Sequence, residues 1–217
     1  MLRQELQSHL DKVYPFSKID TEHTLCGKVT IRFELGDDFE NGSSERVNQA
    51  TERALTIFNE IFEGSNDTLW VLIYEYQGED IFTGSNEYLY QQFQTEKFKH
   101  FYNELELVNS SHFLEDQNGN EVFEKIKAKI IIGKLEKNEI KIKDIFCGIA
   151  NREMGLEPII NQSIYFLTAS AEKGFHMYDD RGCFIWSDIP GKIKDIYVRR
   201  NDWISDYTRE DVDEFFK

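Results

Sequence analysis

Hydrophobic and polar residues repeat with two different periods along the first third of the chain. Residues 2–13 place Leu or Val at spacings of three and four, and residues 44–62 repeat this helical spacing after a candidate N-cap serine. Residues 28–35 alternate apolar and polar side chains, as a half-buried strand does. Residues 69–74 are apolar throughout, which is typical of a central strand. The pattern predicts two helices and two strands, with Phe58 of the second helix buried against a sheet that contains residues 69–74.

The middle of the chain is rich in aromatic residues and lysines. Residues 86–105 carry aromatic side chains at roughly helical spacing, so a helix is predicted there. Asn118-Gly119 predicts a turn. Residues 125–135 alternate Lys with Ile or Ala before becoming wholly apolar, and a long strand is expected. Glu136–Asn138 is then predicted to be a hairpin turn into residues 140–142.

The last third of the chain predicts one more amphipathic helix, three consecutive strands and two short closing helices. The helix spans residues 142–155, where Gly155 suits the C-terminal position. In the last closing helix, Thr208 and Asp211 have the spacing of a capping box. The strands are predicted at residues 163–168, 174–178 and 183–186, the last two as an antiparallel hairpin whose turn is 179–182.

Helices and strands alternate early, and strands then cluster. This order predicts the α+β class, with a mixed or mostly antiparallel sheet and helices packed on it. No Pro/Gly/Ser-rich linker divides residues 1–217, so a single compact domain is expected. A subdivision near residue 118 is the alternative, because the charge balance changes there.

Composition narrows the class of protein. The chain is 40% hydrophobic and 14% aromatic, which excludes a disordered protein. Its three cysteines lie far apart, so no disulfide framework is expected. We find no signal-peptide h-region and no apolar run that could span a bilayer, and we expect a cytoplasmic protein. The net charge of −15 would repel phosphate and anionic lipid, which argues against nucleic-acid and membrane partners.

The negative charge is concentrated in one stretch of sequence. Residues 54–124 hold 14 acidic and 2 basic residues. A concentrated acidic surface can steer a basic protein partner, although net charge can also serve solubility alone. Glu79, Asp80 and Glu87 fall around Gly78 and Gly84 in a predicted loop of this stretch, so we expect them to be exposed and to contribute to binding.

The sequence lacks the phosphate loop, the dinucleotide glycine fingerprint, the zinc-protease helix motif and the serine nucleophile elbow. Its most distinctive segment is Phe175–Trp186. Asp179, Asp180, Arg181 and Gly182 suit a hairpin turn. Alternatively, together with His176, they form a polar site in which a carboxylate acts as acid or base and Arg181 binds an anion.

The cysteines and histidines suggest two further candidate sites, a zinc site and a cysteine nucleophile. His23, Cys26, His176 and Cys183 could ligate zinc, although structural zinc sites prefer closer ligand pairs than the second of these. Cys147 or Cys183 could pair with His176 as a nucleophile, although neither has the sequence context of a known catalytic cysteine. Buried, inert cysteines are the simpler interpretation, and no cofactor or metal is expected.

Several segments together resemble a bacterial family called domain of unknown function 3885, found in spore-forming Gram-positive bacteria. The resemblance covers residues 27–217 and is most specific at Met177–Gly182. This chain has Cys183-Phe184 where the family usually has Leu-Asp. The resemblance implies a compact cytoplasmic protein with no assigned activity. The matching segments are Ile145–Asn151, Leu156–Pro158, Tyr165-Phe166, His176–Gly182, Trp203–Tyr207 and Asp213–Phe216.

These observations leave alternative functions open. The first is an acidic protein-binding module, such as an immunity protein that inhibits a basic toxin domain, because tyrosine and tryptophan anchors surrounded by charge suit an interface. The second is an enzyme with its site around His176, Asp179, Asp180 and Arg181. The third is a protein that self-associates through aromatic surface. The sequence fixes no oligomeric state.

Overall fold

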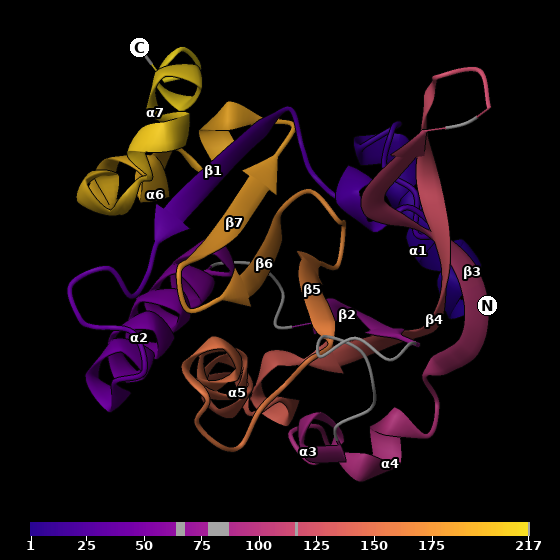
Figure 1. Cartoon of the computed structure of the whole chain (residues 1–217), viewed down its shortest axis with the longest axis horizontal. Coiled ribbons are helices and arrows are strands. Elements are labelled where there is room, and N and C mark those ends of the chain that lie inside the picture. Colours follow the sequence, from indigo (N-terminus) through magenta and orange to yellow (C-terminus); the bar gives the residue numbers. More distant parts are fainter. Residues whose placement is uncertain (64–67, 78–86, 116, 217) are drawn as a thin grey trace.

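A seven-stranded sheet organises the chain in a computed structural model that describes residues 1–63, 68–77, 87–115 and 117–216 (Figure 1). The strand order is β1-β7-β6-β5-β2-β4-β3, and every neighbouring pair is antiparallel. The fold is therefore α+β, as predicted. The strands are β1 (Val29–Glu34), β2 (Thr68–Tyr76), β3 (Tyr102–Glu115), β4 (Glu121–Glu136), β5 (Ser163–Thr168), β6 (Gly174–Asp179) and β7 (Gly182–Ser187).

Helices flank both faces of the sheet. Figure 1 shows α2 and α5 on one side and α1 on the other. The helices are α1 (Leu2–Val13), α2 (Ser44–Ile61), α3 (Glu87–Tyr90), α4 (Thr95–Phe98), α5 (Ile142–Met154), α6 (Lys194–Arg199) and α7 (Asp206–Asp213). Single 3-10 turns are η1 (Glu22–Thr24), η2 (Lys137–Glu139), η3 (Pro190–Lys192) and η4 (Asn201–Trp203).

The first sheet face carries the larger core, under α2 and α5. Ser43 caps α2 by accepting a hydrogen bond from the backbone N–H of Arg46 at 3.2 Å. Phe58 of α2 is fully buried, and its ring centroid lies 5.4 Å from that of Phe175 and 5.2 Å from that of Phe166. Edge-to-face packing of this kind adds to the free energy of burial and fixes α2 on the sheet.

The second sheet face carries a smaller core, because successive residues of a strand point to opposite faces. Trp70 and Tyr74 of β2 pack there with Leu6 and Leu10 of α1. The Tyr74 hydroxyl donates a hydrogen bond of 2.7 Å to the Ile19 carbonyl, which holds the segment after α1 on the sheet. This α1 packing lies over β2 and β4, whereas residues 22–26 of the following segment lie against side chains of β5, β6 and β7.

The predicted helix over residues 86–105 is wrong. The segment contains α3, α4 and the start of β3. Its aromatic side chains pack on one another around Phe98 rather than along one helix face. The Phe101 ring covers Gly133 of β4, where any Cβ would lie within 2.3 Å of ring atoms, and pairing with β4 then extends the chain from Tyr102 onwards.

Two local predictions, one for the segment after β4 and one for the start of the last helix, are also wrong. Residues 137–139 form η2 instead of a hairpin, because Glu139 accepts a hydrogen bond from the backbone N–H of Glu136 at 2.8 Å in a capping box. The chain then enters α5 directly. At the C-terminus, α7 begins at Asp206, two residues before the expected cap at Thr208. The predicted capping box has Asp211 where Glu or Gln is usual, and this incomplete motif does not determine where the helix begins.

The remaining predicted elements are confirmed. α1, α2 and α5 match the expected helices, and the last three strands match the expected strands. β6 and β7 form the predicted hairpin around residues 179–182. The turn near residue 118 joins β3 to β4 within one sheet. Among the described helices, none combines the length and apolarity that crossing a bilayer requires.

Candidate functional site

The turn between β6 and β7 holds Asp179 and Arg181 together. Asp179 is 2% exposed. Its Oδ1 accepts a hydrogen bond from the Arg181 backbone N–H at 2.7 Å, and its Oδ2 accepts one from Arg181 Nε at 2.8 Å. The carboxylate therefore closes the turn on its own backbone and neutralises the arginine that follows.

Asp180 points away from its neighbour. It is 1% exposed and pairs with Arg46 of α2, whose guanidinium also donates to the Phe39 carbonyl at 3.1 Å. The two adjacent carboxylates thus bind different arginines, and the second ties the hairpin to α2. Binding of an outside ligand by Asp179, Asp180 and Arg181 stays a prediction, and their internal contacts give these residues a structural role.

Gly182 and Tyr178 complete this turn. A Cβ on Gly182 would lie 2.3 Å from the Tyr178 hydroxyl oxygen, so no larger residue fits without movement. The same hydroxyl accepts a hydrogen bond from Arg32 Nε of β1 at 2.8 Å. Close packing against Tyr178 therefore explains the glycine at the end of the motif.

The acidic stretch 54–124 is divided among several elements in the structure. Glu60 at the end of α2 pairs with Arg200, and Glu106 of β3 pairs with Arg3 at 2.8 Å. Glu75 of β2 is buried. Glu87 is exposed at the start of α3, whereas Glu79 and Asp80 lie outside the described residues. Contribution of these last three to binding stays a prediction.

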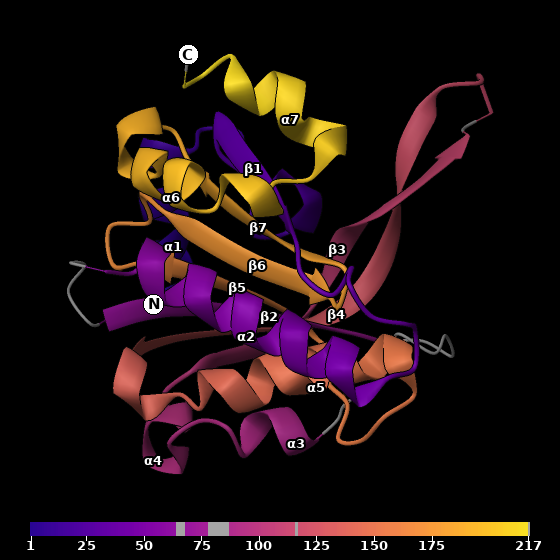
Figure 2. The same ribbon diagram turned by 90° about the vertical axis from the view of Figure 1, so that its left-hand side faces the viewer.

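The C-terminal helix presents a second acidic surface. Tyr207 of α7 is 91% exposed and Phe215 is 39% exposed. The one basic residue of α7, Arg209, turns inward and donates to the Ile204 carbonyl at 2.8 Å. We call the following exposed residues the Tyr207 surface: Asp202, Asp206, Tyr207, Glu210, Asp211 and Glu214. Figure 2 shows α7 on the outside of the molecule, beside β1.

A cavity of about 270 Å³ lies between the second sheet face and residues 22–26. It is lined by Glu22, His23, Leu25, Cys26, Thr30, Tyr165, His176, Phe184 and Trp186. We call it the sheet cavity. It brings together three of the four residues considered for zinc. The fourth, Cys183, belongs to the core on the opposite sheet face.

The candidate zinc site does not form in the described part of the chain, where no group of three His, Cys, Asp or Glu side chains is arranged to hold a metal ion. Both predicted cysteine–histidine pairs are also separated. Cys183 packs in the first core while His176 lines the sheet cavity on the other face, and Cys147 lies on α5 beside the first core. Burial raises the pKa of the Cys183 thiol, so it is an inert core residue.

His176 is held as a neutral imidazole. Its Nδ1 lies 2.9 Å from the Ile164 carbonyl oxygen, so Nδ1 carries the hydrogen and Nε2 is left as an acceptor. The ring stacks on Tyr165 with centroids 4.1 Å apart. Burial lowers the pKa of His176 to about 4, although the hydrogen bond to Ile164 opposes this shift.

Glu22 is the one carboxyl among the residues that line the sheet cavity. The Tyr165 hydroxyl donates a hydrogen bond of 2.9 Å to its Oε1. Desolvation raises the pKa of Glu22 to about 7, against the opposing effect of hydrogen bonds from Ser163 and Tyr165. Sequence analysis missed Glu22 because it lies in an irregular segment without hydrophobic periodicity, and only the sheet brings it to His176.

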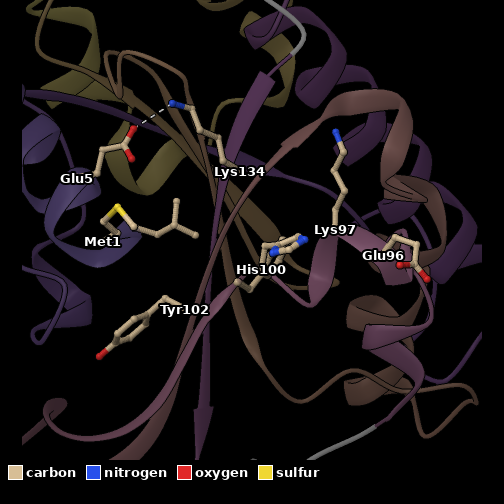
Figure 3. A pocket seen from close by; sticks show the side chains of 9 residues that line it. Met1, Glu5, Glu96, Lys97, His100, Tyr102 and Lys134 are labelled. Atoms are coloured by element: carbon tan, nitrogen blue, oxygen red, sulfur yellow. Dashed lines mark hydrogen bonds and ion pairs between the residues drawn. The ribbon is translucent and has the colours of Figure 1, made fainter.

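A larger, open groove of about 720 Å³ lies between α1 and the start of β3 (Figure 3). Its charged side chains are engaged within the protein. Lys134 pairs with Glu5 at 3.2 Å and Lys97 pairs with Glu139 at 2.8 Å. Because its charged side chains pair within the protein, this groove offers a ligand fewer unpaired charges than the sheet cavity does.

Comparison with known proteins places the chain in a family. It is 22% identical over 190 residues to the "Uncharacterized protein YnaE" of Bacillus subtilis (strain 168), an alignment that covers 82% of this chain and 86% of that protein. No solved structure gives a significant match to the chain. The family model described as "Domain of unknown function (DUF3885)" matches residues 6–208. Because this match spans most of the chain, the protein belongs to the DUF3885 family.

Proposed function

We propose that the protein is a binding protein for a basic protein partner, of the kind an immunity protein makes with a basic toxin domain. The Tyr207 surface is the observation that carries this proposal. An exposed aromatic side chain in a segment rich in exposed acidic residues has the composition of an interface anchor with a charged rim.

The charges of this surface are available to a partner. Among the described residues, Asp202, Glu210, Asp211 and Glu214 make no ion pair, and Asp206 pairs only with Arg209 at 3.2 Å. In the described part of the acidic stretch 54–124, by contrast, five acids are paired or buried: Glu60, Glu63, Glu75, Glu96 and Glu106. Uncompensated acids attract a basic partner over about a Debye length, roughly 8 Å at physiological salt.

An enzyme site at the β6–β7 turn has less support. Asp179 and Asp180 are each committed to an arginine of this chain, and Arg181 is neutralised by Asp179. Acid–base chemistry requires a carboxylate that reaches a substrate. His176, the fourth residue of that alternative, faces the sheet cavity instead of the turn.

The test first identifies a basic protein that the full chain captures, beginning with any toxin domain found in a neighbouring gene, and then uses the full chain with that partner. We expect Tyr207→Ala to raise the dissociation rate about tenfold, as loss of an interface anchor does. We expect the double reversal Glu210→Lys and Asp211→Lys to slow association about tenfold at low salt, and added salt to shrink the difference. Surface plasmon resonance measures both rates.

The matched control is the double reversal Glu40→Lys and Glu157→Lys, which changes the net charge equally at exposed positions away from α7. It should alter association much less than the α7 reversal. Equal effects of the two reversals, together with no effect of Tyr207→Ala, would contradict recognition through this surface.

A further inference from the structure

The walls of the sheet cavity are mainly aromatic. Tyr165, Phe184 and Trp186 come from β5 and β7, and His23 reaches the cavity from η1. His23 is itself fixed by stacking on Phe123 of β4, with centroids 4.1 Å apart. Aromatic rings attract cations through their negative faces, and the attraction strengthens where water is excluded.

The same cavity contains a single negative charge without a basic partner. Glu22 supplies it, and no Lys or Arg is among the described residues that line the cavity. Arg32 lies two residues beyond Thr30 on the same face of β1, but it pairs with Glu34 at 2.9 Å and donates to Ser205 Oγ at 2.6 Å. Among the residues that the structure describes, no Lys or Arg therefore pairs with the Glu22 carboxylate.

We propose that the sheet cavity is a binding site for a small organic ammonium ion. The Glu22 carboxylate, oriented by the Tyr165 hydroxyl, supplies the counter-charge, and the surrounding rings supply cation–π attraction. A volume of about 270 Å³ suits a ligand of this size and leaves little room for a macromolecular chain. The positive ligand also matches the overall charge of −15, which raises the local concentration of cations.

Other chemistries fit the cavity less well. An anion would meet Glu22 and neutral His176 with no cationic side chain among the described lining residues. Covalent chemistry at Cys26 is disfavoured, because desolvation and the nearby Asp188 carboxylate raise the pKa of its thiol and keep it protonated. A cation that binds non-covalently can interact with both the Glu22 carboxylate and the aromatic rings of the cavity.

The test is a titration of the full chain with choline, followed by the amide NMR signals of Glu22, Thr30 and His176. The comparison ligand is dimethylbutanol, which has the shape of choline but carbon in place of the ammonium nitrogen. We expect choline to bind in about the millimolar range and about tenfold or more tightly than dimethylbutanol. Signals outside the sheet cavity should move little.

Variants separate the cavity from the acidic surface. Glu22→Gln should abolish the preference for choline, and Phe184→Leu should weaken choline binding several-fold while keeping apolar volume. Glu40→Gln removes one exposed acid elsewhere and should change nothing. The melting temperature of each variant shows whether it is folded.

Three results would overturn the proposal: no cavity signals move with choline, choline and dimethylbutanol bind equally, or folded Glu22→Gln and Phe184→Leu both bind choline like the parent. Binding through the Tyr207 surface is measured separately, since the sheet cavity contains no residue of α7.

The pH dependence of the affinity for choline provides a second test of the role of Glu22. Choline should bind more tightly as pH rises from about 6 to 8, since the burial-raised pKa of Glu22, about 7, lies in this range. A pH-independent affinity in this range would argue against Glu22 as the counter-charge. The titratable groups around Glu22 are Tyr74 from β2, Tyr165 from β5, His176 from β6, and His23 and Cys26 from its own segment.

Discussion

Two groups that line the sheet cavity, Glu22 and His176, make opposite contributions to stability as the pH changes. Desolvation raises the pKa of Glu22 from 4.5 to about 7, so between these values the folded protein binds more protons than the unfolded chain. Its contribution to stability therefore falls as pH rises through this window. Burial lowers the pKa of His176 from 6.5 to about 4, so its contribution rises with pH between those values.

We expect Glu22→Gln to uncover the effect of Glu22. Glutamine does not ionise, so the variant avoids the cost of charging residue 22 in the folded protein. The free energy of unfolding of the variant, relative to that of the parent, should therefore increase as pH rises from about 5 to 7. Urea unfolding at several pH values measures this difference. The exposed Glu40→Gln should give a flat difference, and a flat result for Glu22→Gln would show that the Glu22 carboxyl ionises as it does in water.

The pair between Arg46 and Asp180 gives a second residue-scale prediction. Arg46→Met would leave the Asp180 carboxylate 1% exposed and without its partner, so we expect a loss of about 3–5 kcal/mol in unfolding free energy. Lys143→Met is the control, because both side chains of its pair with Glu52 are exposed and the pair should contribute little to stability. Similar losses for the two variants would contradict a special role for Asp180.

At the scale of elements, the largest buried side chain of α2 is that of Phe58. We expect Phe58→Ala to lower the free energy of unfolding by about 3–5 kcal/mol, because its ring is fully buried among Phe146, Phe166 and Phe175. Leu55→Ala, at a partly buried position of the same helix, should cost less. A loss below about 1 kcal/mol for Phe58→Ala would contradict this packing.

Elements with a strong local pattern could be predicted, and those decided by distant partners could not. α2 and β1 repeat their apolar residues with one period over several turns or pairs, and both lie where expected. The start of β3 has aromatic residues at helix-like spacing, but pairing with β4 places Tyr102 opposite Ile132 and makes the segment extended. Tertiary pairing overrides local propensity in such a case.

At the scale of the molecule, the candidate sites depend on the arrangement of the sheet. The β6–β7 turn was predictable because Asp179 to Gly182 are typical turn residues. The sheet cavity was not, because Glu22 and His176 are far apart in sequence and meet only when residues 22–26 lie on β5 and β6. The Tyr207 surface was not predicted, because the sequence pattern does not tell which aromatic side chain of the last helix is exposed beside its acids, and the structure shows that this is Tyr207.

The strand order also has a consequence for how the protein is made. β1 pairs with β7, and no other described strand flanks it, while α2 rests on side chains of β5 and β6. A ribosome synthesises the chain from its N-terminus, so β1 and α2 emerge long before the strands that complete them. Contacts of such sequence separation form slowly. In the nascent chain, Val29–Glu34 and the apolar face of α2 therefore lack their partners until residues 163–187 have left the exit tunnel. If translation stops before residue 163, the released chain cannot bury its core.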